Sequence, residues 1–424
     1  MKGLLLTTRS TTDAADSRPA LPEAAPALPA VVWVLGAVAF LMGTTELVVA
    51  GLLPEIAAAL TVSVSSAGLL ITVFAVGMMI GAPVMALATL RLPKRSTLIA
   101  ALLVFAAGHV VVAISTSFEI VLAARFASAL ATGTFWAVGA VVAAAAAGPN
   151  ASARAMGVMI GGVTMANVVG VPLGAAGGQA LGWQGPFWVL AVLALASTFL
   201  IARQVPAQAG GDVSAASLRE EFAAIRQVRM WLIYAATALM QGSVLAAYSY
   251  VSPLLTERAG LPAAFVPLAM LGYGAGALAG TTYGGRKGDR RPFLVLIPAA
   301  GLLAVVLAAI TLFATSSAVA VILVVLLGTF GMVASPVLVA LVVRTAGTAQ
   351  ALAVSLSTSS FNVGIAGGSW LGGVALASGL QNQGPPLSGL VLALAALLPL
   401  TLLAVGYRRR VTGAVVNGHS DDKY

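Results

Sequence analysis

The chain has 424 residues, of which 60% are apolar and only 8% are charged. Soluble domains carry about 25% charged residues, because a globule must cover its surface with polar groups. The composition therefore excludes a soluble enzyme, and a mean hydropathy of +1.02 excludes a disordered chain. Long unbroken apolar runs differ from the alternating pattern of a membrane β-barrel. The lack of cysteine excludes disulfides and thiolate metal sites. These features predict an all-α polytopic membrane protein.

A membrane-spanning helix needs about 20 mostly apolar residues. Twelve segments meet this requirement, and each is predicted to be a transmembrane helix. In chain order they are residues 31–53, 66–88, 97–116, 120–146, 155–180, 186–203, 230–253, 264–285, 293–314, 317–343, 350–378 and 388–407.

The twelve segments fall into two six-helix bundles, at residues 31–203 and 230–407. Between them, residues 204–229 break the apolar pattern and include an amphipathic helix with acids in its first turn. This linker is either a connector on the membrane surface or a regulatory docking site. Residues 1–30 are predicted to be a disordered tail, and residues 408–424 a second tail that is unstructured after its run of arginines.

The basic residues predict the orientation. With a cytoplasmic N-terminus, 20 of the 22 lysines and arginines are cytoplasmic, whereas Arg258 lies outside and Arg125 lies within a helix. The positive-inside rule expects this asymmetry, which requires an even number of spans and places both termini in the cytoplasm. The net charge of +9 then reflects topology and contact with anionic lipid. A clustered basic face that would predict a nucleic-acid partner is missing.

An internal repeat links the two bundles. At a constant shift of 195 residues, the Gly-Thr-Phe sequence at 133–135 falls on the same sequence at 328–330, and Asn167 falls on Asn362. Repeats of six helices in parallel orientation predict two halves related by an axis along the membrane normal. Such a design places the substrate near the midplane between the halves and exposes it to each side in turn.

Glu46 is the only acid within a predicted span. A carboxylate in the membrane interior costs about 2.5–3.5 kcal/mol on insertion scales, and protonation largely removes that cost. A lone carboxyl in a cavity is therefore suited to carry protons or to contact substrate. The alternative is a neutral acid that is hydrogen-bonded to a neighbouring helix.

Arg125 is the only base within a predicted span. Its guanidinium does not deprotonate, so it must face a partner or water. It either contributes to proton coupling with an acid or anchors the outer end of its helix near Glu119.

The fifth helix is rich in glycine, and glycine allows helix backbones to approach closely. It is either a tightly packed helix or a bendable helix that seals the path between the halves. The residues that define it are Gly161, Gly170, Pro172 and Gly174.

Two basic loops join helices 2 and 3 and helices 8 and 9. The acid among the bases of the second loop suggests a charge latch, although simple positive-inside anchoring explains the bases equally well. The residues concerned are Arg91, Lys94 and Arg95 in the first loop, and Arg286, Asp289 and Arg290 in the second.

Polar and aromatic residues within the spans are candidates to line a cavity, although each alone is more often a contact between helices. As a set they suit an amphiphilic ligand that bears an aromatic ring better than a polyol. They are Met78, Phe135, Trp136, Asn167, Gln241, Tyr248, Tyr273, Phe330, Asn362 and Trp370.

The histidine count argues against a metal centre. Only His109 and His419 are present, and they do not form a metal-binding cluster. His109 is predicted to be a core or helix-contact residue, with a proton relay as the less favoured alternative. We expect neither a metal nor another cofactor.

Two stretches and a pair of aromatic dipeptides point to a family. Residues 40–57 read FLMGTTELVVAGLLPEIA, residues 161–174 read GGVTMANVVGVPLG, and Gly-Trp at 182–183 is followed by Phe-Trp at 187–188. These stretches resemble the Major Facilitator Superfamily, and specifically its twelve-helix drug:proton antiporters. They are similar to a subgroup with actinobacterial chloramphenicol efflux proteins and bacterial arabinose and sugar efflux permeases. The similarity covers nearly the whole chain between the tails.

The resemblance gives roles to some residues. Glu46 matches the subgroup's helix 1 glutamate and Arg125 the helix 4 arginine that is linked to proton transfer. Gly161, Gly170 and Gly174 match the helix 5 antiporter motif, although Pro172 comes earlier than the motif's proline. The loop motif between helices 2 and 3 is degraded, because leucine occupies its aspartate position; an aspartate survives in the loop between helices 8 and 9.

The resemblance implies proton-coupled efflux by alternating access, with the proton gradient as energy source and no enzymatic activity. We expect a small hydrophobic or amphiphilic drug as substrate, with a phenicol-type antibiotic favoured. The alternatives are export of sugars or other metabolites and, less favoured, a transporter-like sensor or lipid-handling protein. The expected setting is the bacterial cytoplasmic membrane, with lipid, protons and substrate as the only partners of a monomer.

Overall fold

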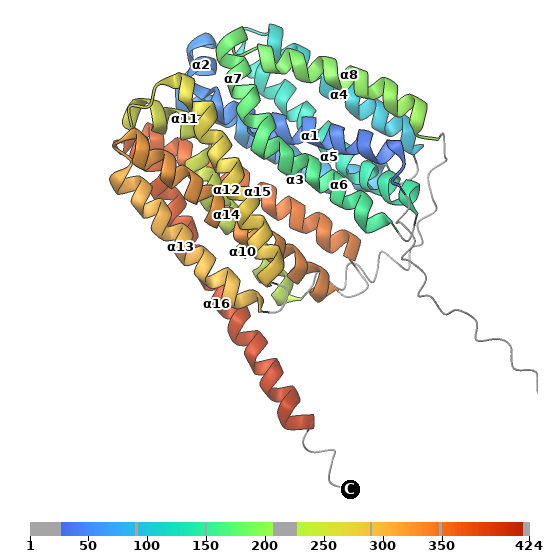
Figure 1. Ribbon diagram of the computed structural model, residues 1–424, viewed down its shortest axis with the longest axis vertical. Coiled ribbons are helices and arrows are strands. Elements are labelled where there is room, and N and C mark those ends of the chain that lie inside the picture. The colour runs from blue at the N-terminus through green and yellow to red at the C-terminus, as the bar shows by residue number, and fades with distance from the viewer. Residues whose placement is uncertain are drawn as a thin grey trace, which may run out of the picture.

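The computed structural model describes residues 27–89, 92–148, 151–206, 227–288, 291–346 and 350–418. Within these ranges all regular secondary structure is helical, as a chain in lipid requires if each segment is to satisfy its own backbone hydrogen bonds. The helices form two bundles that lie side by side, one blue to green and the other yellow to red in Figure 1.

The first bundle contains α1 (Ala30–Val48) with η1 (Val49–Gly51), α2 (Leu53–Ala59), α3 (Val64–Ala88), α4 (Lys94–Ile114), α5 (Phe118–Ala147), α6 (Ser152–Met165), η2 (Ala166–Gly170), α7 (Val171–Leu181) and α8 (Gly185–Gln204). The second contains α10 (Val228–Tyr248), α11 (Val251–Pro253), η3 (Leu254–Arg258), η4 (Ala263–Phe265), α12 (Val266–Gly288), α13 (Pro292–Phe313), α14 (Ser317–Ala346), α15 (Gln350–Ala377), η5 (Gln381–Gln383) and α16 (Gly384–Gly418).

The described helices supply the twelve predicted spans. Eleven of them are long and apolar enough to cross a membrane. The twelfth, α15, has 28 residues but carries serines, a threonine and an asparagine along its middle. It packs between α3 and α10, where protein instead of lipid surrounds much of its surface. The predicted all-α, twelve-helix fold is confirmed.

The chain end differs from the prediction. We expected no structure after Arg410, but α16 continues to Gly418 (Figure 1). Proline is absent between Pro399 and the end of α16, and the helix ends at an Asn-Gly pair that is typical of a C-terminus.

Several other predictions concern residues outside the described ranges. These are the first 26 residues of the N-terminal tail, residues 207–226 of the linker, the last six residues, and three basic-loop residues: Arg91, Asp289 and Arg290.

The 195-residue repeat corresponds to equivalent packing in the two bundles. In the first, α3 packs on α5, α1 on α6, and α4 on α8; in the second, α12 packs on α14, α10 on α15, and α13 on α16. The small residues of the repeat lie at these contacts. Gly133 meets the backbone of Gly81 between α5 and α3, and Gly328 meets Tyr273 between α14 and α12.

The fifth span is interrupted. Its α-helical pattern gives way to the π-helical turn η2 between α6 and α7, with Pro172 just after it. Proline has no backbone N–H, and π-turns accommodate such breaks and often lie at functional sites. On one side of this span Gly162, Gly170 and Gly174 face α1, which leaves no room for side chains. The span is therefore both tightly packed within its bundle and irregular at its centre.

Hydrogen bonds from serine side chains to backbone carbonyls join α3 and α15 and connect the bundles. The Ser65 hydroxyl at the start of α3 donates to the Gly373 carbonyl near the end of α15 (2.6 Å), and the Ser359 hydroxyl donates to the Met79 carbonyl (3.1 Å). The two helices thus run antiparallel and stay in contact from the end where α3 begins to about its middle. This end is the predicted outer side, so the contacts close the space between the bundles on that side.

Two adjacent glycines test the packing of the fifth span on α1. A Cβ atom at Gly162 would overlap the carbonyl of Gly36, whereas a Cβ atom at Gly161 meets nothing within 4 Å. We expect Gly162→Ala to destabilise the protein by about 1–3 kcal/mol through overpacking. Gly161→Ala should leave stability unchanged or raise it by up to about 1 kcal/mol, because alanine favours helix. Thermal unfolding of both variants in detergent checks the difference, and equal melting temperatures would contradict it.

Candidate functional site

A cavity of about 390 Å³ lies at the interface of the two bundles. Its first-bundle lining comes from α1, α3, α5, α6 and η2, and its second-bundle lining from α10, α12, α14 and α15. The repeat predicts a central site between the halves, and the cavity occupies that place. The lining residues are Gly43, Glu46, Met78, Trp136, Ile160, Val163, Thr164, Asn167, Thr237, Thr281, Met332, Ser335, Val339, Val354, Ser357, Thr358, Phe361 and Asn362.

Glu46 is the only acid or base among these lining residues. It lies near the end of α1, where Thr45 and Leu47 on either side of it are buried. The surrounding wall combines apolar groups such as Met78 and Trp136 with hydroxyl and amide groups from α15. Such a site suits a ligand that is mostly apolar with a few hydrogen-bonding groups.

Arg125 lies behind Glu46 and is almost fully buried, at 1% exposure. Its Nη1 donates a hydrogen bond to the Thr45 hydroxyl (2.8 Å), and its guanidinium lies 4.2 Å from the centre of the Phe74 ring. It also interacts electrostatically with the Glu46 carboxylate. Its Nε and Nη2 make no hydrogen bond within the described part of the chain. Arg125 therefore turns to α1 and does not pair with Glu119, whose carboxylate accepts from Ser117.

Four of the ten predicted cavity residues line the cavity: Met78, Trp136, Asn167 and Asn362. The two asparagines are the residues that the repeat superimposes. They come from η2 and α15, so the pseudo-symmetry places an amide from each half at one cavity.

The other six predicted cavity residues do not line it: Phe135, Gln241, Tyr248, Tyr273, Phe330 and Trp370. Phe135 packs edge-on against Trp136, and the Tyr248 and Tyr273 rings stack 3.9 Å apart within the second bundle. Trp370 is 52% exposed on the outer face of α15. The prediction placed these residues within the spans but did not determine which side of each helix faces the cavity.

Sequence reasoning missed most of the hydroxyl groups at the site, among them Thr164, Thr237, Ser335, Ser357 and Thr358. One signal was present. The stretch from Ser355 to Asn362 is the most polar part of any predicted span, and a helix surrounded by lipid would not tolerate it.

The predicted conformational residues take separate positions. Lys94 and Arg95 begin α4, and Arg286 is exposed in the last turn of α12. In the fifth span, Gly170 and Gly174 face α1, Pro172 is buried, and Gly161 faces open space.

A second close contact between the bundles lies beside the cavity. A side chain at Gly274 of α12 would overlap the backbone of Asn167 and Val168 in η2. The π-helical turn of the fifth span thus rests directly on the second bundle. Separation of the bundles at this point requires only that two backbone surfaces part.

Another carboxyl lies near the outer end of the first bundle. Glu55 is in α2, beyond the end of the first span, and its Oε2 is buried without a partner in the described structure. Burial raises the pKa of this carboxyl above its ordinary value. It lies outside the cavity lining, so Glu46 remains the acid of the site. The described residues contain no group of three histidine, cysteine or acidic side chains that could hold a metal ion.

Comparison with known proteins agrees with this architecture. The sequence matches the Major Facilitator Superfamily over residues 35–369. It is 37% identical over 360 residues to a chloramphenicol resistance protein of Streptomyces lividans, covering 84% of this chain and 91% of that protein. It is 32% identical to the inner membrane transport protein YdhP of Escherichia coli (84% and 91% covered), and 30% identical to a probable sugar efflux transporter of Mannheimia succiniciproducens (80% and 86% covered).

Among solved structures, the fold is similar to that of a bacterial homologue of the human lysosomal transporter Spinster in an inward-facing, unoccupied conformation. The TM-score is 0.72, with 89% of this chain and 95% of that chain covered, at 15% sequence identity. A two-bundle helical architecture, a cavity between its halves and a family match over most of the sequence lead to one conclusion: this chain is a membrane transporter of the Major Facilitator Superfamily.

Proposed function

We propose that this transporter exports a small hydrophobic or amphiphilic compound, with a phenicol-type antibiotic favoured, in exchange for protons. The observation that carries the proposal is the cavity between the halves, in which one carboxyl, Glu46, faces a wall of apolar and hydroxyl side chains. The similarity to a chloramphenicol resistance protein supports the choice of substrate. Phenicols combine an aromatic ring with hydroxyl and amide groups, and the wall offers surfaces for both.

Glu46 and Arg125 form the proposed coupling pair. A carboxyl at a water-accessible cavity in the membrane can be neutral or charged depending on which side of the membrane supplies or removes its proton. Arg125 lies behind the Glu46 carboxyl, and substrate in the cavity competes with the proton for that group. Proton binding and drug binding are then mutually exclusive, as antiport requires. One proton that crosses 100 mV supplies about 2.3 kcal/mol, to which the pH gradient adds.

The contacts on the outer side support an inward-open conformation as one of the two states of the transport cycle. The halves meet along the outer portion of α3 and α15, and α12 rests on η2. In this inward-open conformation the transporter takes up drug from the cytoplasmic leaflet or the cytosol. Both chain termini lie in the cytoplasm of a bacterial cell.

Sugar or metabolite export is the second candidate. The hydroxyl and amide groups of Ser357, Thr358 and Asn362 on α15 favour it, as does the similarity to a probable sugar efflux transporter. The large share of apolar groups in the rest of the wall favours the drug.

Glu46→Gln tests the coupling. The amide keeps the shape of the carboxyl but cannot carry a proton, so we expect pH-driven chloramphenicol transport in proteoliposomes to be abolished while the protein folds and still binds drug. Arabinose flux in the same vesicles tests the second candidate. The matched control is Glu119→Gln, since Glu119 lies outside the cavity at the start of α5. Wild-type coupling in Glu46→Gln would refute the proton-carrier role.

Single cysteines test the cavity, because the natural chain has none. We expect Asn362→Cys to react with a water-soluble maleimide and to be protected by chloramphenicol. Trp370→Cys, on the same helix but exposed outside the bundles, should react slowly and show no protection. Equal protection of both cysteines, or protection of neither, would contradict binding in this cavity.

A further inference from the structure

We propose that His109 is a positioning residue that holds Arg125 in place through Thr45. This inference rests on the proposed role of Arg125 in coupling and extends it to a residue that the sequence alone identifies only as a core histidine. Three helices meet at the group: α4 carries His109, α1 carries Thr45, and α5 carries Arg125. All three side chains are buried, with exposures of 1%, 0% and 1% respectively.

The hydrogen bonds form a continuous chain. Arg125 Nη1 lies 2.8 Å from Thr45 Oγ1, which lies 2.7 Å from His109 Nε2. On the other side of the ring, His109 Nδ1 lies 2.7 Å from the carbonyl oxygen of Phe105. Each of these hydrogen bonds is short. Together they hold Thr45, the residue next to Glu46, between the Arg125 guanidinium and the His109 ring nitrogen.

The two ends of the chain set the direction of every hydrogen bond. A guanidinium only donates, so Thr45 Oγ1 accepts from Arg125. A carbonyl only accepts, so Nδ1 of His109 carries a proton. The Thr45 hydroxyl then has one proton left to donate, and a neutral His109 accepts it at Nε2. The geometry thus specifies one tautomer of a neutral imidazole.

The surroundings favour this neutral state. The Phe105 ring stacks on the imidazole with centroids 4.0 Å apart, and the Phe187 ring of α8 lies 5.9 Å away. Arg125 on α5 is connected to the imidazole through Thr45. An imidazolium here would place a second cation beside a buried guanidinium. It would also donate from Nε2 to the Thr45 oxygen, so the Thr45 hydroxyl proton would lose its acceptor at His109.

The consequence concerns Glu46. Arg125 retains free N–H groups on Nε and Nη2 when Nη1 is bound to Thr45. With the guanidinium held in this way, those groups stay available to the carboxylate at the next position of α1. Without the acceptor nitrogen of His109, the Thr45 hydroxyl can rotate away. The Arg125 guanidinium then loses the hydrogen-bond acceptor that holds its position.

Nitrogen NMR tests the tautomer directly, because the chain has only two histidines. In the full chain with His419→Asn, labelled in lipid nanodiscs, His109 gives the only imidazole signals. We expect a neutral ring protonated at Nδ1 at pH 7.5, and a shift of the Nε2 resonance in Thr45→Val. A ring protonated at Nε2, an imidazolium, or no response to Thr45→Val would overturn the inference. This readout does not depend on transport, so it separates failure of the inference from failure of the proposed function.

Transport and stability variants test the positioning role. His109→Gln offers an amide N–H to Phe105 and a carbonyl to Thr45, so we expect it to keep most of the coupling. His109→Leu offers neither, and we expect a severalfold loss of proton-coupled flux and a changed pH profile. The losses in melting temperature for His109→Leu and Thr45→Val should be less than additive, since both break one chain. Equal fluxes for the Gln and Leu variants, or additive losses, would count against the role.

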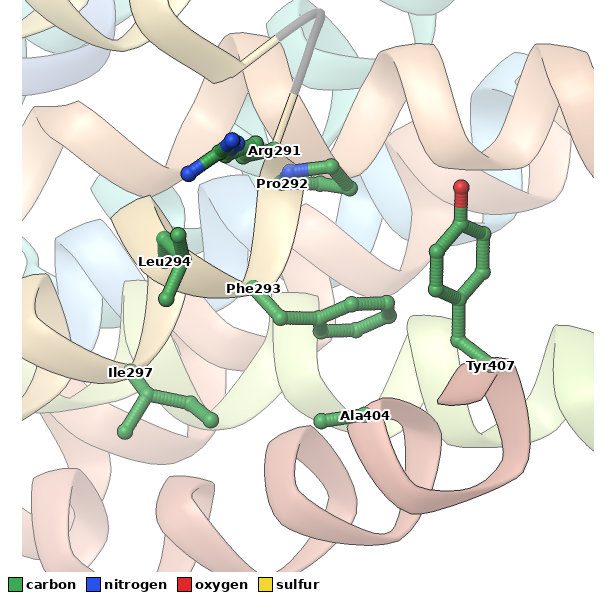
Figure 2. A pocket seen from close by; sticks show the side chains of 7 residues that line it. All are labelled: Arg291, Pro292, Phe293, Leu294, Ile297, Ala404 and Tyr407. Carbon is green, nitrogen blue, oxygen red and sulfur yellow. The ribbon is translucent and has the colours of Figure 1, made fainter. Parts of the chain in front are cut away.

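A different observation carries a second inference, which is independent of the transport mechanism. A hollow of about 290 Å³ lies between the start of α13 and the end portion of α16. Figure 2 shows Arg291 and the hydroxyl of Tyr407 at one end of it, Ile297 and Ala404 at the other, and the Phe293 ring between them. We infer that this hollow binds one anionic phospholipid, with its phosphate at Arg291 and an acyl chain along the apolar part.

Charge and polarity point to that occupant. The end with Arg291 and Tyr407 is the predicted cytoplasmic side, where the Arg229 guanidinium also lies 5.9 Å from the Tyr407 ring centre. Three more arginines follow Tyr407 in the sequence. The hollow holds no acid, and its far end is made of aliphatic groups. Basic pockets between helices on this side of a membrane suit lipid head groups, and each basic residue near an anionic surface contributes about 1 kcal/mol.

Native mass spectrometry of the full protein tests the lipid site. We expect tighter binding of dioleoyl phosphatidylglycerol than of dioleoyl phosphatidylcholine, which has the same acyl chains. Arg291→Gln should weaken the phosphatidylglycerol complex about fivefold, the factor that ~1 kcal/mol corresponds to. Arg203→Gln is the matched control, because Arg203 lies at the same predicted face but in the other bundle, over the Phe199 ring. Equal affinities for the two lipids, or equal losses in the two variants, would overturn the inference.

Discussion

The constraint on which the rest of the structure depends is the cost of an ionisable group within a membrane. A carboxylate or guanidinium surrounded by lipid must find a partner, reach water or lose its charge. This chain places Glu46 at a cavity and Arg125 behind it, on a neighbouring helix of the same bundle. The positions of both helices follow, since α1 must border the space between the halves and α5 must lie close enough for Arg125 to reach α1.

The cavity in turn explains the unusual composition of α15. Lipid-facing helices of this protein are almost uniformly apolar, whereas α15 carries hydroxyl and amide groups in its middle. Ser357 and Asn362 are nearly fully buried there, and Ser359 reaches across to the backbone of α3. One stretch of polar residues thus lines the cavity and also joins the two bundles beside it. A helix with both tasks cannot also be as hydrophobic as its neighbours.

The sequence predicted the fold well because the relevant signals are long and additive. A run of about 20 apolar residues identifies a span, and the positions of 22 bases predict its direction without any knowledge of packing. Glu46 was equally visible, since it is a single acid in apolar surroundings. Helix rotation was not visible. Where a helix is apolar on all sides, periodicity does not separate the face toward lipid from the face toward protein, and Trp370 was therefore assigned to the cavity although it faces outward.

Long-range hydrogen bonds also could not be predicted from the sequence. Nothing in the spacing of Thr45, His109 and Arg125 indicates that they meet, because their contact depends on how α1, α4 and α5 pack. The chain end was not predictable either: no structure was expected after Arg410, but α16 continues to Gly418 through residues of mostly low helix propensity. Local composition predicts which segments cross the membrane, whereas the site depends on contacts between segments.

The contacts that join the halves combine hydrogen bonds with apolar packing. On the outer side they include the hydrogen bond from the Ser65 hydroxyl to the Gly373 carbonyl, glycine surfaces such as Gly274 against η2, and a buried apolar cluster with members in both bundles. A hydrogen bond of this kind contributes about 0.5–1.5 kcal/mol net, and backbone surfaces separate without leaving buried charges behind. Within the first bundle, the glycine contacts of α1 with the fifth span and the hydrogen-bond chain from Arg125 to His109 hold the helices together. In the proposed mechanism the two halves move as rigid bodies, and the Glu46 carboxyl lies at the cavity on the boundary between them.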